Sequence, residues 1–194
     1  MHRAGDEATS MVLPFELLTP SAWRNGGGVT REVVASRKPE WRLSIASLQE
    51  SGPFSFFPGL DRTFLLASGG GVTLHVDASA HPLAFGQCLA FGGESTVVAD
   101  VPPEGGVGVN LMVRRDHGVG TIRVLPVAGS ADMAARGLRA VVVLTGELAL
   151  ADGSRLAPLH SLVHLPPSIS LVGEGTVAQV IVNASHRPPR TDAG

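Results

Sequence analysis

The sequence contains a single cysteine, Cys88, and a single lysine, Lys38. One cysteine excludes an intramolecular disulfide, and its place beside Leu89 in an apolar run is more typical of a buried, unreactive thiol than of a nucleophile. Lysine and arginine total 15 and aspartate and glutamate 17, which gives a net charge of −2. This balance indicates neither a basic face for nucleic acid nor a polybasic run for an anionic membrane.

Long apolar runs are missing as well. No uninterrupted apolar stretch approaches the ~20 residues that cross a bilayer, and the polar residues 1–7 do not resemble the apolar run of a signal peptide. We therefore expect a cytoplasmic protein without a membrane partner. A phosphate loop, a dinucleotide fingerprint and a Gly-x-Ser-x-Gly nucleophile motif are also missing from the sequence.

What the chain does contain is apolar material divided by turn residues. It is 44% hydrophobic, with 24 glycines and 14 prolines that fall between short apolar runs. This pattern predicts many short strands in a sandwich or barrel. The one helix candidate is Ser130–Arg136, with Ser130 as its cap and Gly137 as its stop. Residues 1–10 and 186–194 are expected to form flexible tails.

A weak internal repeat relates the two parts of the chain. Arg62–Gly69 matches Arg139–Gly146 with arginine on arginine, apolar on apolar, and glycine on glycine. A duplicated small β-barrel explains this similarity. The sequence thus predicts an all-β bicupin, with cupin-like jelly-roll halves at 11–116 and 117–185 packed as one body. The strands on either side of the Gly69–Gly71 run are expected to form a hairpin.

The stretch from Trp23 to Glu32 contains three consecutive glycines between polar and aromatic residues. Glycines in a row are expected where a Cβ would collide with a neighbour or where φ must be positive. We expect this stretch to wall one side of a small-molecule pocket, lined by Trp23, Asn25 and Thr30. A tight turn before an ordinary strand is the alternative.

Polar side chains inside apolar strands point to the rest of the pocket. Asn110 and Arg114 share one strand face with Met112 between them, and Arg62 begins a strand that continues into an apolar run. Arginine can bind a carboxylate with two hydrogen bonds, and an amide can donate or accept. Alternatively, Asn110 and Arg114 face solvent, or Arg114 forms a structural pair with Glu94 or Asp116. The phenylalanine-rich loop that holds Phe57 is expected to act as a lid.

The sequence offers few candidate ligands for a metal. The His-x-His pair, glutamate and later histidine of many cupin enzymes are missing. His75 and Asp77 lie two apart on a strand and so share a face, but they are weak metal candidates without further ligands. His160 and His164 are likewise more typical of solvated or core-edge histidines. We expect no metal and no cofactor, and we identify no catalytic residue.

Three segments in matching order, Trp23–Glu32, Gly52–Arg62 and Asn110–Arg115, resemble the HutD/Ves family. The resemblance implies a bicupin fold, a bacterial cytoplasmic location and, for the HutD branch, an association with histidine utilisation. It suggests a regulatory or sensing role with a ligand of the formylglutamate or urocanate class. The chain departs from the family at Gly108-Val109, where relatives tend to have an acidic and a large apolar residue.

Three functions remain open from the sequence. In the first, a non-enzymatic bicupin holds a small anionic metabolite with Arg62, Asn110 and Arg114, while Trp23 and Phe57 shield it. In the second, an isomerase or hydrolase acts on a small acid, with or without metal, through His75, Asp77 and Glu94. In the third, the chain is an interaction module, with a homodimer formed through edge strands.

Overall fold

The computed structural model describes residues 10–23, 26–38 and 40–184. In this part the chain forms strands β1 to β16 and one short 3-10 helix, η1 (Phe15–Leu17). The predicted all-β, cupin-like fold is confirmed. The predicted helix at Ser130–Arg136 is wrong, because β12 (Gly118–Met133) runs through Ser130 and pairs along its whole length with β16 (Ile169–Ala184). This long-range pairing overrides the local capping signals.

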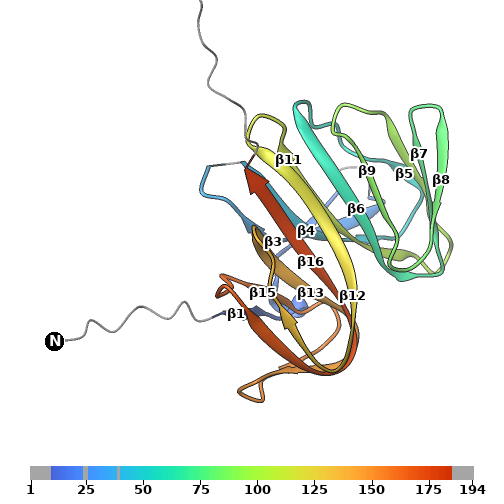
Figure 1. The fold of residues 1–194 in the computed structure, drawn as a ribbon. Coiled ribbons are helices and arrows are strands. Elements are labelled where there is room, and N and C mark those ends of the chain that lie inside the picture. Colours follow the sequence, from blue (N-terminus) through green and yellow to red (C-terminus); the bar gives the residue numbers. More distant parts are fainter. Residues whose placement is uncertain (1–9, 24–25, 39, 185–194) are drawn as a thin grey trace, which may run out of the picture.

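The strands form three sheets (Figure 1). One sheet, here called the C-terminal sheet, has the order β1-β15-β13-β16-β12, with β14 paired to β13. Besides β12 and β16 it contains β1 (Met11–Leu13), β13 (Leu138–Leu150), β14 (Arg155–Leu156) and β15 (Ser161–Val163).

The other two sheets come from β2 to β11, which lie between β1 and β12 in the sequence. The central sheet has the order β2-β3-β4-β11-β6-β9, and the small sheet has the order β5-β10-β7-β8. The central strands are β2 (Pro20–Ala22), β3 (Gly28–Ala35), β4 (Trp41–Leu48), β6 (Leu60–Gly69), β9 (Cys88–Gly92) and β11 (Gly106–Arg114). The small sheet contains β5 (Gly52–Pro53), β7 (Val72–Val76), β8 (Ser79–Leu83) and β10 (Val97–Asp100).

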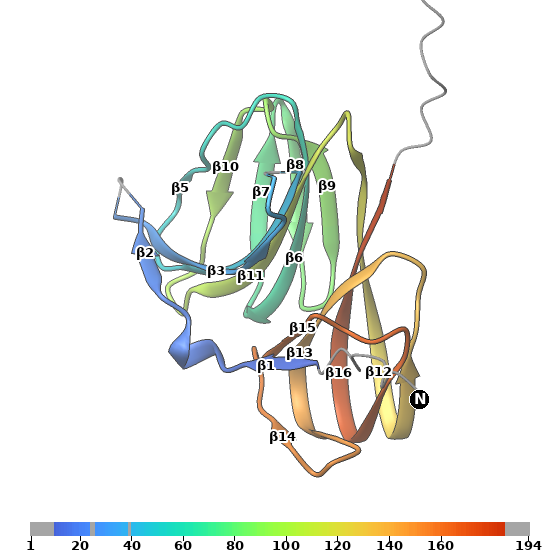
Figure 2. The ribbon, with the colours of Figure 1, turned by 90° about the vertical axis from the view of Figure 1, so that its left-hand side faces the viewer.

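The central sheet lies between the other two sheets (Figure 2). An apolar core covers each of its faces. Successive side chains of a strand point to opposite faces. Leu65 therefore packs with Val142 of the C-terminal sheet, whereas Phe64 packs with Leu74 of the small sheet. A third apolar core lies on the other face of the C-terminal sheet, around Val141 and Leu171. The sheets do not close into a single barrel.

The glycines after β6 do not make the predicted hairpin. β6 pairs with β9 and β11, whereas β7 pairs with β8 and β10, so the two strands belong to different sheets. Gly69 and Gly71 have φ values of +111° and +124°, a region that L side chains rarely adopt. The run therefore lets the chain leave one sheet and enter the next.

The two repeated segments occupy matching positions. β6 and β13 are both interior strands, and Gly69 and Gly146 both have positive φ at the same point of the repeat. The boundaries 11–116 and 117–185 stay a prediction. β1 lies within the first range but pairs with β15, which lies in the second.

Candidate functional site

A cavity of about 470 Å³ lies on the face of the central sheet that is turned toward the small sheet. Strands β2, β3, β4, β6 and β11 supply its floor, and the loop after β5 covers it. Its lining combines hydroxyls, two guanidinium groups and an amide with an apolar wall: Ser21, Ala22, Trp23, Thr30, Arg42, Ser44, Pro53, Phe54, Ser55, Phe57, Arg62, Asn110 and Met112.

Arg62 is the central charge of this cavity and is only 5% exposed. Its Nη1 donates to the Ser55 carbonyl and its Nη2 to Asn110 Oδ1, both at 3.2 Å, while its buried Nε has no hydrogen-bond partner. Burial, and secondly the charge of Arg42, lower the pKa of Arg62 to about 10. The guanidinium thus remains charged at neutral pH, and no carboxylate among the described residues pairs with it.

Three phenylalanine rings surround the Arg62 guanidinium. Its carbon lies 4.9 Å from the ring centre of Phe91, 5.2 Å from that of Phe54 and 5.6 Å from that of Phe57. Aromatic faces attract a cation, but they do not neutralise its charge. The rings therefore hold the guanidinium in place and leave its charge available to an anion.

The neighbouring polar groups present mainly donors to the cavity. Arginine can only donate, so the oxygen of Asn110 must face Arg62 and its amide NH₂ points elsewhere. Thr30 Oγ1 accepts from Trp23 Nε1 at 2.7 Å, which leaves its own proton to donate. Ser44, which is 2% exposed, adds a hydroxyl opposite Asn110 on the adjacent strand. Such a set suits a ligand rich in acceptors.

The glycine run explains how Trp23 reaches this position. Gly26 has a φ of +76° and lies in the turn that Gly26 N closes on the Trp23 carbonyl at 3.1 Å. A Cβ on Gly28 would lie 2.5 Å from the Ser47 carbonyl and 3.1 Å from the Trp23 ring. The run thus provides both the positive φ and the close approach that the sequence indicated. Asn25 lies outside the described residues.

The phenylalanine-rich loop has a mixed role. Phe54 meets Trp23 edge to face with ring centres 6.0 Å apart, and its ring centre lies 5.8 Å from that of Phe64 on β6. Phe54 and Phe57 line the cavity, while Phe56 is 60% exposed. Two of the three rings therefore cover the cavity, and the third faces solvent.

Five of the seven predicted pocket residues line this one cavity: Trp23, Thr30, Phe57, Arg62 and Asn110. Arg114 does not, because its guanidinium pairs with Asp116, with Nε 3.1 Å from Oδ1. His75 Nε2 instead lies 2.7 Å from Asp100 Oδ2, and Asp77 accepts from the Thr96 amide at 3.0 Å. Within the described residues, no three histidine, cysteine or acidic side chains gather as metal ligands.

Sequence reasoning missed several lining residues, above all Arg42, Ser44 and Phe54. Arg42 and Ser44 alternate with Trp41, Leu43 and Ile45 along β4, so their shared face was visible in the sequence. The missing information was that β4 lies between β3 and β11, which makes this polar face an interior one.

The departure at Gly108 has a structural counterpart. Gly108 lies two residues before Asn110 on the same face of β11, and a Cβ there would collide with the Phe64 ring. Phe64 is fully buried and in turn contacts Phe54. Gly108 therefore makes room for the ring that supports the aromatic cover of the cavity.

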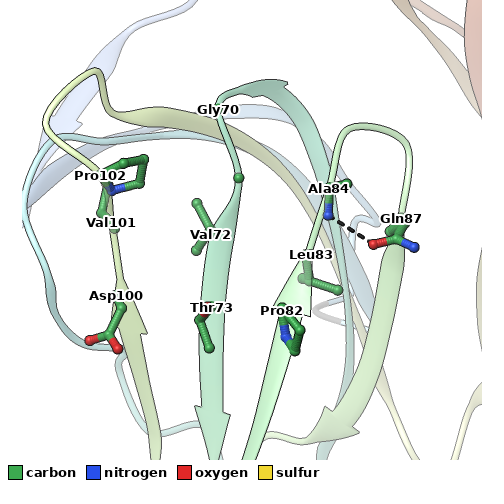
Figure 3. Close-up of a pocket in the computed structure, with 11 residues that line it drawn as sticks. Gly70, Val72, Thr73, Pro82, Leu83, Ala84, Gln87, Asp100, Val101 and Pro102 are labelled. Carbon is green, nitrogen blue, oxygen red and sulfur yellow. Dashed lines mark hydrogen bonds between the residues drawn. The ribbon is translucent and has the colours of Figure 1, made fainter.

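A second hollow, of about 770 Å³, lies at one end of β7, β8 and β10. Figure 3 shows Val72, Thr73, Pro82 and Asp100 on these strands, and the Gln87 side chain bound to the Ala84 amide. Asp100 is the one charged residue among its described lining residues, and it already contacts His75. This hollow therefore lacks the unpaired charge that distinguishes the first cavity.

The first cavity presents a buried cation and hydrogen-bond donors rather than groups that exchange protons. Among its described lining residues there is no histidine, aspartate, glutamate, cysteine or lysine to move a proton.

No helix in the described part of the chain has the length and apolar character to cross a membrane.

The fold and its internal cavity define a cupin-like protein. One solved structure with this fold is a cupin 2 conserved barrel domain protein from Leptotrichia buccalis, at a TM-score of 0.59 and 13% identity, covering 89% of this chain and 96% of that one. The HutD family model matches residues 16–179. The chain belongs to the HutD family.

Relatives at higher identity agree with this assignment. A conserved protein of unknown function from Pseudomonas aeruginosa PAO1 superposes with a TM-score of 0.77 at 26% identity, covering 90% of this chain and 99% of that one. HutD from Pseudomonas fluorescens SBW25, solved in a formate condition, gives 0.72 at 26% identity, covering 90% and 100%.

Curated relatives match over a shorter length. Protein Ves from Citrobacter koseri is 43% identical over 109 residues, which is 53% of this chain and 56% of the relative. Protein Ves from Cronobacter sakazakii is 40% identical over 136 residues, or 67% of this chain and 74% of that one. The chain thus spans little more than half of the first of these relatives.

Proposed function

We propose that this protein binds a small carboxylate metabolite in the cavity around Arg62 and acts as a regulatory or accessory protein of histidine utilisation in the cytoplasm. The observation that carries this proposal is the buried Arg62 guanidinium, which is charged and has no carboxylate partner among the described residues. A buried charge is unfavourable unless it is paired. A bound anion supplies the missing partner.

The donors around Arg62 support a carboxylate in particular. The Arg62 guanidinium, the Asn110 amide and the Ser44 and Thr30 hydroxyls can donate toward one acceptor-rich group. The family supplies the biological direction, since formylglutamate and urocanate are the ligand classes that its histidine-utilisation branch suggests. Binding without turnover fits a cavity whose described lining lacks an acid–base pair. A homodimer through edge strands is also part of this proposal.

Thermal shift measurements with formylglutamate, urocanate, glutamate and sugar acids test the proposal. A ligand that binds only the folded state raises the Tm, and the stabilisation grows with the logarithm of the ligand concentration above its Kd. We expect at least one acid to raise the Tm at millimolar concentration, and Arg62→Ala to remove this response.

Arg139→Ala is the matched control, because Arg139 holds the same place in the repeat but is exposed. It should keep the full response. If Arg62→Ala does not fold, Asn110→Ala serves instead and should weaken the affinity for the acid by about tenfold, the equivalent of one lost hydrogen bond to a charged group, with a smaller rise in Tm. An absent response in the unaltered protein, or an equal response in the Arg62 variant, contradicts the proposal.

A further inference from the structure

Two guanidinium groups line the cavity, but only one of them lacks a carboxylate. Arg42 Nε lies 3.5 Å from Glu32 Oε2, an ion pair without a hydrogen bond, whereas no acidic residue of the described chain pairs with Arg62. The cavity with its contacting side chains therefore carries one uncompensated positive charge. One positive charge without a counter-ion matches a ligand with one negative charge.

The register of the central sheet places Glu32 beside the cavity. Arg42 and Arg62 are the cross-strand neighbours of Met112 on either side of β11, so all three lie in one row across the sheet. Glu32 is the cross-strand neighbour of Ser44 in the adjacent row. Its side chain is 56% exposed and that of Arg42 is 38% exposed, so the pair lies at the solvent side of the cavity.

We propose that Glu32 is a specificity-determining residue that makes the cavity selective for monocarboxylates. This inference rests on the proposed function, because it concerns the same site. The acid group of the ligand binds Arg62, Asn110 and Ser44, and the rest of the ligand lies along Trp23, Phe54, Phe57 and Met112. Glu32 is already the counter-ion of Arg42, so a second acid group at that end would have to compete with Glu32 for this cation.

A second carboxylate would also meet a like charge. It would approach Glu32, and like charges at short distance disfavour the ionised forms of both groups. Discrimination in binding comes from such repulsive elements as much as from attractive ones. Urocanate carries one carboxylate and formylglutamate two, so the inference favours the urocanate class over the formylglutamate class.

Calorimetric titration with glutarate and with its monoamide isolates this charge effect. The two molecules have nearly the same size and differ by one negative charge. We expect the unaltered protein to bind the monoamide about tenfold more tightly than the diacid. Glu32→Gln releases Arg42 and should remove or reverse this ratio, while Arg139→Gln, distant from the cavity, should leave it unchanged.

The outcomes separate this inference from the proposed function. If neither acid binds, and urocanate and formylglutamate do not bind either, the proposed function fails and this inference fails with it. If the acids bind but the diacid is preferred, or if Glu32→Gln leaves the ratio unchanged in a protein that still unfolds cooperatively, the selectivity role of Glu32 alone is overturned.

Discussion

Arg62 and Arg139 hold matching positions in the two parts of this molecule, yet one is buried and the other exposed. In both β6 and β13, the strand carries a bulge before the glycine with positive φ, at Ala67 and at Leu144. β13 has a second bulge, because Leu138 pairs with Ile181 and Ala140 pairs with Val180, the residue immediately before Ile181. Arg139 is the extra residue.

This second bulge changes which side chain faces inward. A shift of one residue moves side chains to the opposite face of a sheet. Leu138 therefore packs against the apolar core of the C-terminal sheet, and Arg139 turns to solvent. In β6 no such bulge is present at Arg62, so its guanidinium enters the cavity. One inserted residue in β13 thus explains why the matching arginine is buried beside the central sheet but exposed in the C-terminal sheet.

The amides opposite these strands show the same contrast. Asn110 is the cross-strand neighbour of Phe64, and Gln179 is the neighbour of Val141 at the matching place. Asn110 accepts from Arg62, whereas Gln179 Nε2 lies 3.5 Å from the sulfur of Met133. The same scaffold therefore holds an open polar cavity in one part and a methionine-filled core in the other.

Removing Met133 should break this contrast and produce the largest effect on stability. Met133 is 2% exposed in the core of the C-terminal sheet. Met133→Ala leaves a cavity and an unpartnered Gln179 amide, and should lower the free energy of unfolding by about 2–5 kcal/mol. Chemical denaturation measures the loss.

The matched control is Met112→Ala, since Met112 lines a cavity that already exists. It should cost less stability and should weaken acid binding, whereas Met133→Ala should leave acid binding unchanged. Equal losses of stability in the two variants would contradict the distinction between an open and a filled interior.

A smaller effect is expected from Gly108→Ala. Gly108 and Phe64 are diagonal neighbours on β11 and β6, and Val177 and Val141 hold the matching places on β16 and β13. A glycine faces a large ring in the first part, whereas two valines of equal size meet in the second. A Cβ on Gly108 would displace the Phe64 ring, and overpacking of this kind costs about 1–3 kcal/mol. Stability and acid affinity should both fall, as seen by denaturation and by thermal shift.

Phe64→Leu in the same chain should restore part of the Gly108→Ala loss, because the smaller side chain vacates the space that the new methyl group needs. A double-mutant cycle measures this coupling. Strictly additive losses would show that Gly108 does not act by making room for the ring.

Local patterning made much of this structure predictable. Alternation along β4 and β11 and the spacing of glycines and prolines predicted short strands in an all-β fold. Arg62 and Asn110 could be identified because they stand inside apolar strands, where a charge or an amide is unfavourable unless it has a binding partner. Thr30 and Trp23 could be identified because the intervening glycines indicated a close approach.

The features that could not be predicted depend on long-range pairing. Nothing local shows that β6 and β7 join different sheets or that Arg139 is a bulge, because both follow from the register with distant strands. Arg114 resembled Asn110 by alternation, but it lies at the end of β11 beside Asp116, which pairs with it. Arg42 was overlooked because a polar face on a strand is usually a solvent-facing one.

The smallest effect should come from a change at the rim of the cavity. The C-terminal sheet has a filled core at the matching place and therefore no such rim. Trp23→Phe keeps an aromatic wall but removes the 2.7 Å hydrogen bond from Nε1 to Thr30 Oγ1. The acid affinity should fall by a few-fold, in line with about 0.5–1.5 kcal/mol for one hydrogen bond. Isothermal titration with the acid identified by thermal shift measures this loss of affinity.

Trp41→Phe is the control, because Trp41 is the other tryptophan and packs against the core on the opposite face of the central sheet. Thr30→Val removes this hydrogen bond together with the hydroxyl that donates to the ligand, so it should weaken binding more than Trp23→Phe, and the double variant should lose no more than Thr30→Val alone. Additive losses would mean that the indole and the hydroxyl contact the ligand separately rather than as one hydrogen-bonded unit.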